Sequence, residues 1–430
     1  MRISKISVKN YKCFDDAEVQ LNDKYTVLVG INGAGKTALL ECIKVFLNGL
    51  LYTMRCNTQI YTLNRNAKIK KMMYEGTSSI ERQYPVEVKV SASIQGYDEF
   101  DYITEAYNEH FEESSSSSEH VIDFIRNIPY ALVSEGNNIV LPIMAVYGTG
   151  RLWKHVQDKD KFEIGEPVSR LTGYDRCLEA DSDEERLVTW FKRMTMIEWQ
   201  EKKTPIELEI VKNAMAECYK SILHDNQEVI VQYDVRDGEL HIVIRYANGM
   251  SEKVPFTKMS DGIRIAMAMV ADIAHRMVTL NPQLGKGALS ETNGIVLIDE
   301  IDMHLHPSWQ KHIIADLCKI FPQVQFVFTT HSPIVLSNVK NDNIVALSSG
   351  KVYKVNQKTY GRAADSIMKE IMGTDVRPED VSALQDKFNT ALDRGEIEKA
   401  KIILADLIEH LGADDELIMN NQASIDFEEL

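Results

Sequence analysis

The chain has 430 residues, 44% of them hydrophobic, and a formal net charge of −16. This length and apolar content support a sizeable core in one large α/β unit or in two or three domains, while the acidic balance argues against a broad nucleic-acid-binding face. Six scattered cysteines without a C-x-x-C pair predict reduced thiols, neither disulfides nor a zinc site. There is no apolar signal segment at the start and no apolar run long enough for a bilayer. We therefore expect a soluble, cytoplasmic protein with no membrane partner.

The first elements lead to a glycine-rich loop. Residues 3–8 alternate apolar and polar, as in a half-buried strand, and a second strand is expected around residues 18–21. An apolar strand at 25–29 then runs into G-x-x-x-x-G-K-T at Gly30–Thr37, and helical residues follow. Strand, glycine loop and helix start form the context in which this pattern binds phosphates.

This loop predicts a nucleoside triphosphate site. Its backbone N–H groups and the helix dipole suit phosphate oxygens, through Gly30, Asn32, Gly33, Ala34 and Gly35. We expect Lys36 to reach the β- and γ-phosphates and the Thr37 hydroxyl to bind Mg²⁺. The alternative is an ordinary glycine-rich turn before a lysine, which does not explain the flanking strand and helix.

The middle of the chain is less regular. One alternating strand is expected at 86–94, and the tract of Glu112-Glu113 followed by serines 114–118 predicts a mobile surface loop. An apolar strand at 139–147 precedes Arg151, and a hairpin is expected to join 229–235 to 240–244. Residues 184–218 have helical periodicity, with a predicted buried side made of Leu187, Trp190, Phe191, Met194 and Met196.

Two later strands end in polar residues. The apolar run at 294–298 predicts a buried parallel strand that carries Asp299 and Glu300 at its carboxyl end, where ligands bind in open sheets. Asp299 is expected to hold Mg²⁺ through water, and Glu300 to act as general base. The strand at 324–328 leads to His331, which can donate a hydrogen bond to the γ-phosphate. A core strand and a structural histidine are the alternatives, but all these groups converge on one sheet edge.

The remaining signals are weaker by themselves. Ser260, Asp261 and Gly262 begin a helix expected at 263–277, where they suit either anion binding or simple capping by Ser260. His304 and His306 lack companion ligands for zinc, so we expect them to shape the loop after the acids and to touch a neighbouring subunit. A helical pair is expected at 378–412, and the acidic tail 414–430 is expected to be partly ordered at best.

Taken together, these motifs resemble the ABC-type ATPases of the SMC/RecF class from residue 1 to about 339. The resemblance implies an α/β fold: an ABC-type P-loop NTPase head, with a mixed sheet flanked by helices, an inserted helical and β-hairpin subdomain and a helical C-terminal extension. It implies a nucleotide-proximal role for Lys12 and a signature motif at Ser260–Gly262, with Asp261 where glycine is commoner. Arg151 is the candidate sensor residue, since no Q-loop glutamine can be placed.

The expected division has an ATPase domain at 1–340, with lobes 1–150 and 258–340 around the inserted subdomain 151–257, and a strand and helical extension at 341–430. The chain lacks the coiled-coil arm of true SMC proteins and an Asp-x-Asp nuclease strand after His331.

An ATPase without its own nuclease, with the stretch Tyr147–Trp153 and a helical C-terminus, is most similar to the Septu ATPase family, PtuA, of anti-phage defence. That family works with a separate HNH-type nuclease, PtuB. The resemblance implies ATP and Mg²⁺ as cofactors, ATP hydrolysis, a homo-oligomer that shares its ATP sites, an HNH-type nuclease partner and DNA reached through the complex. A RecF-like repair ATPase that binds DNA itself is the alternative, and a transporter-associated ABC subunit is a third hypothesis.

Overall fold

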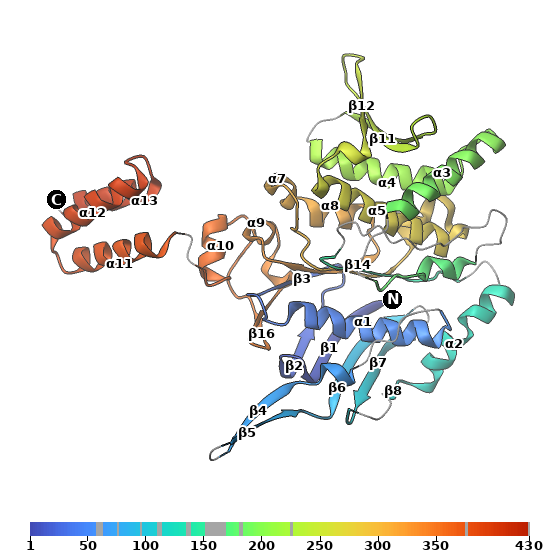
Figure 1. Ribbon diagram of the computed structural model, residues 1–430, viewed down its shortest axis with the longest axis horizontal. Helices are drawn as coiled ribbons and strands as arrows, with labels where there is room; N and C mark the ends of the chain where they lie inside the picture. The colour runs from blue at the N-terminus through green and yellow to red at the C-terminus, as the bar shows by residue number, and fades with distance from the viewer. Residues whose placement is uncertain are drawn as a thin grey trace. The chain divides into compact units, whose positions relative to one another are not determined.

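The computed structural model forms two compact units, Met1–Gly361 and Arg362–Leu430 (Figure 1). It describes residues 1–56, 63–74, 77–94, 97–109, 114–134, 139–150, 169–179, 184–223, 227–374 and 377–428. The first unit extends beyond the expected boundary at residue 340. The reason is that β15 (Ile344–Ser348) pairs with β3 (Tyr25–Val29) and so belongs to the ATPase sheet.

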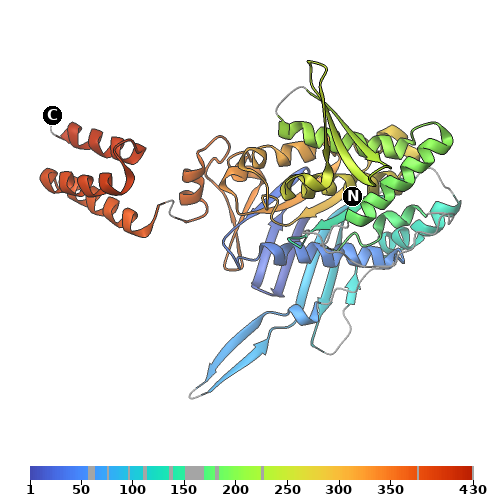
Figure 2. The ribbon, with the colours of Figure 1, turned by 45° about the horizontal axis from the view of Figure 1, so that its top comes forward.

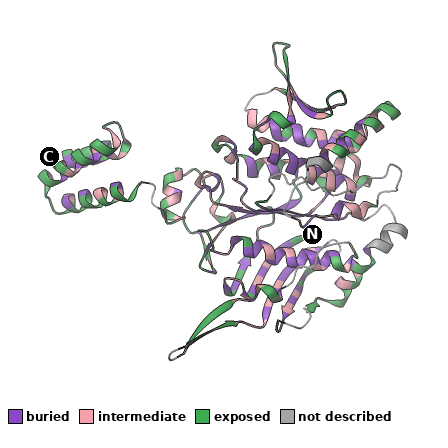
Figure 3. Ribbon diagram, in the orientation of Figure 1, coloured by how far each residue is buried: buried purple, intermediate pink, exposed green. Residues whose placement is uncertain are grey.

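A six-stranded mixed sheet lies at the centre of the first unit, in the order β16-β15-β3-β14-β13-β9. Its other strands are β9 (Ile143–Tyr147), β13 (Gly294–Ile298), β14 (Val324–Thr330) and β16 (Lys351–Lys354). All neighbours are parallel except β15 and β16. β13 and β14 are buried along their whole length, as continuous apolar runs predict for strands covered on both faces (Figure 3). The expected strand at 139–147 begins later, at Ile143.

A second, antiparallel sheet has the order β2-β1-β6-β7-β8. Its strands are β1 (Arg2–Tyr11), β2 (Phe14–Gln20), β6 (Val86–Ile94), β7 (Tyr97–Ala106) and β8 (Ser114–Ser116). The expectation of a mobile loop at the serine tract was wrong for 114–116, which pair with 103–105 of β7. β8 lies at the edge of the sheet, where a strand makes main-chain hydrogen bonds to one neighbour only. Three serines with exposed side chains can therefore form this strand. A ribbon of β4 (Ile69–Tyr74) and β5 (Thr77–Arg82) projects from this region (Figure 2).

Helices cover the central sheet on both faces (Figure 1). α1 (Lys36–Thr53) follows the glycine loop and contacts β14 of the central sheet and β1, β6 and β7 of the antiparallel sheet. α5 (Asp261–Leu280) contacts β9 from the other side and packs on α4 (Ile206–Leu223). The other helices of the unit are α2 (Glu119–Ser134), α3 (Glu184–Glu201), α6 (Ala288–Glu291), α7 (Pro307–Gln310), α8 (Ile313–Ile320) and α9 (Pro333–Leu336).

The inserted subdomain holds α3, α4 and a three-stranded sheet. The expected helical segment is two helices, because Pro205, directly before α4, lacks the N–H needed to continue α3. Leu187 and Phe191 are buried as predicted, whereas Met196 is 46% exposed and the expectation of burial was wrong there. The predicted hairpin is β10 (Glu228–Asp234) and β11 (Glu239–Arg245), and β12 (Ser251–Pro255) adds a strand that was not predicted.

The second unit is helical, with α10 (Ala364–Glu370), α11 (Glu379–Asp393), α12 (Ile397–Leu411) and α13 (Glu416–Glu428). α11 and α12 confirm the expected helical pair. The tail was wrongly expected to be partly ordered at best, because Ile418 and Ile425 lie two turns apart on one face of α13 and join the core of this unit. Across the described ranges of both units, no helix is long and apolar enough to cross a membrane.

Candidate functional site

The glycine loop Gly30–Thr37 lies between β3 and α1. Gly33 and Gly35 have φ of +78° and +111°, in the left-handed region that favours glycine. A Cβ on Gly35 would lie 2.6 Å from the Phe14 ring, and one on Gly30 would lie 2.3 Å from the Leu347 carbonyl oxygen. The loop is therefore fixed by close backbone packing against the β1–β2 turn on one side and β15 on the other.

Lys36 folds back over this loop. Its Nζ donates hydrogen bonds to the carbonyl oxygens of Gly30 (2.8 Å) and Ile31 (3.2 Å), and the residue is 7% exposed. Burial lowers the pKa of Lys36, and the nearby charges of Asp299, Glu300 and Asp302 oppose that shift. The ammonium group is thus a buried cation at the phosphate loop, with donors that suit phosphate oxygens.

Asp299 is the buried carboxylate that connects the loop to the sheet. Its Oδ2 accepts a hydrogen bond from Thr37 Oγ1 at 3.1 Å, and its Oδ1 accepts one from Thr329 Oγ1. Its backbone N–H donates to Tyr147 O of the neighbouring strand at 2.8 Å. A hydroxyl oxygen beside a carboxylate is the ligand chemistry that Mg²⁺ prefers, so Thr37 and Asp299 fit the predicted metal.

The ends of β13 and β14 are joined by side-chain hydrogen bonds. The backbone N–H of Glu300 donates to Thr329 Oγ1 at 2.7 Å, and Glu300 has an uncommon positive φ of 49°. Asp302 Oδ1 accepts from Thr330 Oγ1 (2.6 Å) and from the backbone N–H of His331 (3.3 Å). Glu300 and His331 therefore meet at one sheet edge, and Asp302, which was not among the predicted site residues, joins them there.

Sequence reasoning missed the polar groups that hold this edge together. Thr329 and Thr330 supply the hydroxyls described above, and Gln310 accepts from Ser332 Oγ (2.6 Å) while donating to Leu305 O (2.8 Å). The two threonines that end the apolar strand β14 could have predicted these contacts. Buried carboxylates at the end of a neighbouring strand need hydrogen-bond donors, which threonine hydroxyls supply.

Lys12 lies in the β1–β2 turn beside the glycine loop. Its Nζ forms an ion pair with Glu41 of α1, and Glu41 also accepts a hydrogen bond from the Tyr11 hydroxyl at 3.2 Å. The next residues, Cys13 and Phe14, touch the loop at Gly35. Lys12 is therefore close to the predicted nucleotide site, with its charge paired to the helix that follows the loop.

The signature-like residues lie at the start of α5, beside the loop after Glu300. Ser260 takes the N-cap position, but its side chain makes no capping hydrogen bond, and both Ser260 and Asp261 are exposed. A Cβ on Gly262 would lie 2.1 Å from the His304 carbonyl oxygen, so this glycine allows the two segments to touch. Simple capping by Ser260 is not observed. Arg151, the candidate sensor, lies outside the described residues.

The two histidines of this loop have local contacts. His304 has a positive φ of 63°, and the His306 side chain caps the four-residue helix α7, with Nδ1 2.7 Å from Ser308 Oγ. These contacts agree with the prediction that the histidines shape the loop.

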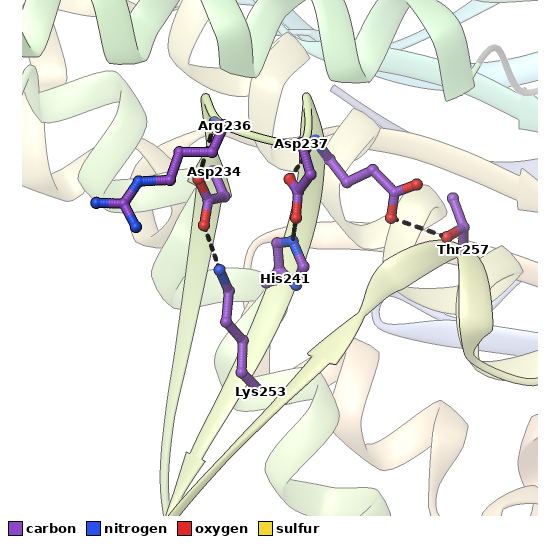
Figure 4. A network of polar contacts seen from close by, with 7 residues as sticks. Asp234, Arg236, Asp237, His241, Lys253 and Thr257 are labelled. Carbon is purple, nitrogen blue, oxygen red and sulfur yellow. Dashed lines mark hydrogen bonds and ion pairs between the residues drawn. The ribbon is translucent and has the colours of Figure 1, made fainter.

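A second group of potential cation ligands lies at the β10–β11 hairpin (Figure 4). Ligand atoms of Asp234, Asp237 and His241 lie within 4.8 Å of one another. However, Asp234 forms an ion pair with Lys253, and Asp237 contacts His241 Nε2 at 2.7 Å. The backbone N–H groups of Arg236 and Glu239 occupy further carboxylate oxygens, at 2.9 and 3.1 Å. These contacts make the group a network that closes the hairpin.

The glycine loop after β3 and the acidic pair after β13, in this mixed sheet, form the arrangement of a P-loop ATPase site. Two family models match the chain, one described as an AAA ATPase domain, over residues 1–139, and one described as an AAA domain, putative AbiEii toxin, Type IV TA system, over residues 182–337. The protein is an ATPase with an α/β fold.

Its distant relatives include two retron probable ATPases and a Septu protein. The Retron Ec83 probable ATPase of Escherichia coli is 26% identical over 99% of this chain and 87% of that protein. The Retron Vc95 probable ATPase of Vibrio cholerae serotype O1 biovar El Tor is 24% identical over 92% of this chain and 84% of the relative. Septu protein PtuA of Bacillus mycoides (strain KBAB4) is 24% identical over 80% of this chain but 40% of its own length. The resemblance to PtuA is confirmed, and the two retron ATPases match over a larger share of both chains.

Proposed function

We propose that the chain is the ATP-hydrolysing subunit of an anti-phage defence complex, in which two copies share their ATP sites and control a separate HNH-type nuclease. One observation carries the shared-site model. Lys36, Thr37, Asp299 and Glu300 belong to one connected site, while the exposed, uncapped Ser260 starts a different helix. The Ser260 hydroxyl and the first N–H groups of α5 are then available to phosphate oxygens held by a second copy.

Each residue has a defined role in this proposal. Lys36 and the N–H groups of the glycine loop neutralise phosphate charge, with Lys12 close to the same loop. Thr37 and Asp299 hold Mg²⁺, which when bound supplies electrostatic stabilisation of the transferred phosphoryl group. Glu300 accepts a proton from the attacking water, and His331 donates a hydrogen bond toward the γ-phosphate oxygen. Ser260, Asp261 and Gly262 act from the facing chain.

The relatives support the defence setting, since they belong to retron and Septu systems and match most of this chain. A separate nuclease is proposed because the sequence after His331 offers no strand that ends in an Asp-x-Asp pair. The net charge of −16 counts against the alternative of a RecF-like clamp with a broad DNA-binding face.

Mixing two inactive variants tests the shared site. Lys36→Ala removes the lysine that binds the phosphates but leaves the signature residues intact. Ser260→Arg disrupts the signature residues but leaves Lys36 in place. Neither variant should hydrolyse ATP alone, and Ser260→Arg should still bind it. A one-to-one mixture should regain measurable turnover, up to about a quarter of the wild-type rate, because half of the pairs are mixed and each holds one complete site of two. A mixture as inactive as its components would refute the shared site.

A separate experiment tests whether the chain has a nuclease partner. The Glu300→Gln variant, loaded with ATP, should co-purify an HNH-type nuclease encoded beside it, and loss of either gene should sensitise cells to phage. If the chain binds no nuclease and its loss leaves phage sensitivity unchanged, the defence assignment fails even where the shared ATP site holds.

A further inference from the structure

A groove of about 1160 Å³ runs through the inserted subdomain, between the end of α3, one face of α4 and the whole of β10. Ligand pockets for small molecules have volumes of about 300–1,000 Å³. The larger volume and the length of β10 suit a polymer segment better than a compact ligand.

One side of this groove is the edge of a sheet. β10 pairs with β11 on one side, and no strand within the described ranges pairs with its other side. At about 3.4 Å per residue, a strand of this length presents a row of N–H and C=O groups roughly 24 Å long. Such an edge is a template for another strand, and many proteins block it.

Two side chains of α3 add to this surface. Thr195 is 6% exposed and lines the groove, and its Oγ1 has no hydrogen-bond partner among the described groups. Buried hydroxyls are usually paired, so this one is a polar atom in the wall of the groove with unused hydrogen-bonding capacity. Trp199 also lines the groove and is 63% exposed, which offers a flat apolar surface to an incoming side chain.

The charges of the groove are largely paired. Glu198 contacts Lys212 at 3.5 Å, and Asp234 forms an ion pair with Lys253. At the hairpin end, Arg236 lines the groove and points away from the network around Asp237 and His241 (Figure 4). Recognition here must rest mainly on main-chain hydrogen bonds rather than on a strongly charged ligand.

We infer that this groove binds an extended peptide segment of a partner protein, which adds to the free edge of β10 as a further strand. A flexible segment fits better than the sheet edge of a folded second copy, because α3 and α4 wall the groove opposite the strand. The inference goes beyond the proposed function, since it assigns a second binding surface that does not involve the ATP site.

A displayed library of random dodecapeptides, selected on the full chain, tests this surface. Enriched peptides should protect main-chain amides of β10 from hydrogen exchange when they bind. Asn213→Trp, which fills the groove from the exposed side of α4, should weaken their binding about tenfold or more.

Glu217→Trp is the matched control, since Glu217 lies one turn further along α4, is exposed and does not line the groove. It should leave peptide binding unchanged. The inference is overturned if no peptide is enriched, if Asn213→Trp and Glu217→Trp act alike, or if bound peptides leave the β10 amides unprotected. ATP turnover of the Asn213→Trp variant should equal that of the wild type, so a failure here is separable from failure of the ATPase model.

Discussion

Lys36 is a cation kept in a buried position by the glycine loop. We predict that Lys36→Ala weakens ATP binding by about 10- to 100-fold, because each hydrogen bond to a charged group contributes roughly 1.5–3 kcal/mol. Titration with a fluorescent ATP analogue measures the change. Lys24→Ala, which removes an exposed lysine just before β3, is the control and should bind as the wild type does. Equal affinity of Lys36→Ala and wild type would contradict the assigned role.

Glu300 carries the predicted general base. Glu300→Gln keeps the size of the side chain but cannot accept the proton, so turnover should fall about 10²- to 10⁴-fold while ATP binding persists. Phosphate release measures turnover, and light scattering with ATP should detect trapped oligomers. The exposed Glu291→Gln serves as control. Normal hydrolysis by Glu300→Gln would assign the base to another residue.

All six cysteines are free, as predicted. Burial raises the pKa of Cys177 from 9.0 to about 12 and that of Cys56 to about 11. The folded state therefore favours the neutral thiols. Their contribution to the free energy of unfolding is fully present below pH 9, and it is lost as the pH rises through the raised pKa values of the folded state. We expect iodoacetamide to label these two thiols slowly at pH 7 and rapidly after unfolding, as measured by mass spectrometry. Fast labelling of the folded protein would show that they are more accessible than described.

At the scale of elements, the strands with continuous or alternating apolar patterns could be predicted from sequence. β3, β6, β13 and the hairpin β10–β11 lie within a residue of their expected bounds, because their burial is encoded locally. β8 could not be predicted, since three serines become a strand only through pairing with β7. The loop, acids and histidine of the site were predictable from motifs, whereas the hydrogen bonds of Thr329 and Thr330 depend on two strands meeting in space.

α5 and the loop after β13 touch at Gly262, where a larger residue does not fit. Gly262→Ala would place a Cβ 2.1 Å from the His304 carbonyl oxygen, so the segments must separate. We expect a loss of roughly 1–3 kcal/mol in the free energy of unfolding, as for overpacked positions, together with reduced ATP turnover. Ser260→Ala, at an exposed residue without a cap bond, should change stability by less than about 0.5 kcal/mol. Urea unfolding compares the two, and equal stabilities would contradict the close contact.

At the scale of the whole molecule, the two units have separate cores. Phe388 is 1% exposed in the core of the second unit, so Phe388→Ala should destabilise that unit by about 3–5 kcal/mol. Hydrogen exchange of the full chain should then accelerate in α11–α13 but not in β13 or β14, and ATP binding should be unchanged. Met419→Ala, at an exposed position of α13, is the control. Faster exchange throughout both units would show that they unfold together.

Glu300 and Ser260 lie on segments that touch where His304 meets Gly262. In a pair of chains, Glu300 would serve the nucleotide bound by its own chain, while Ser260 would serve the nucleotide bound by its partner. A shift of the loop at one nucleotide would therefore displace the groups that contact the other. We expect the two sites of a pair to turn over cooperatively, with a Hill coefficient for ATP different from one, and Gly262→Ala to change that coefficient as well as the rate.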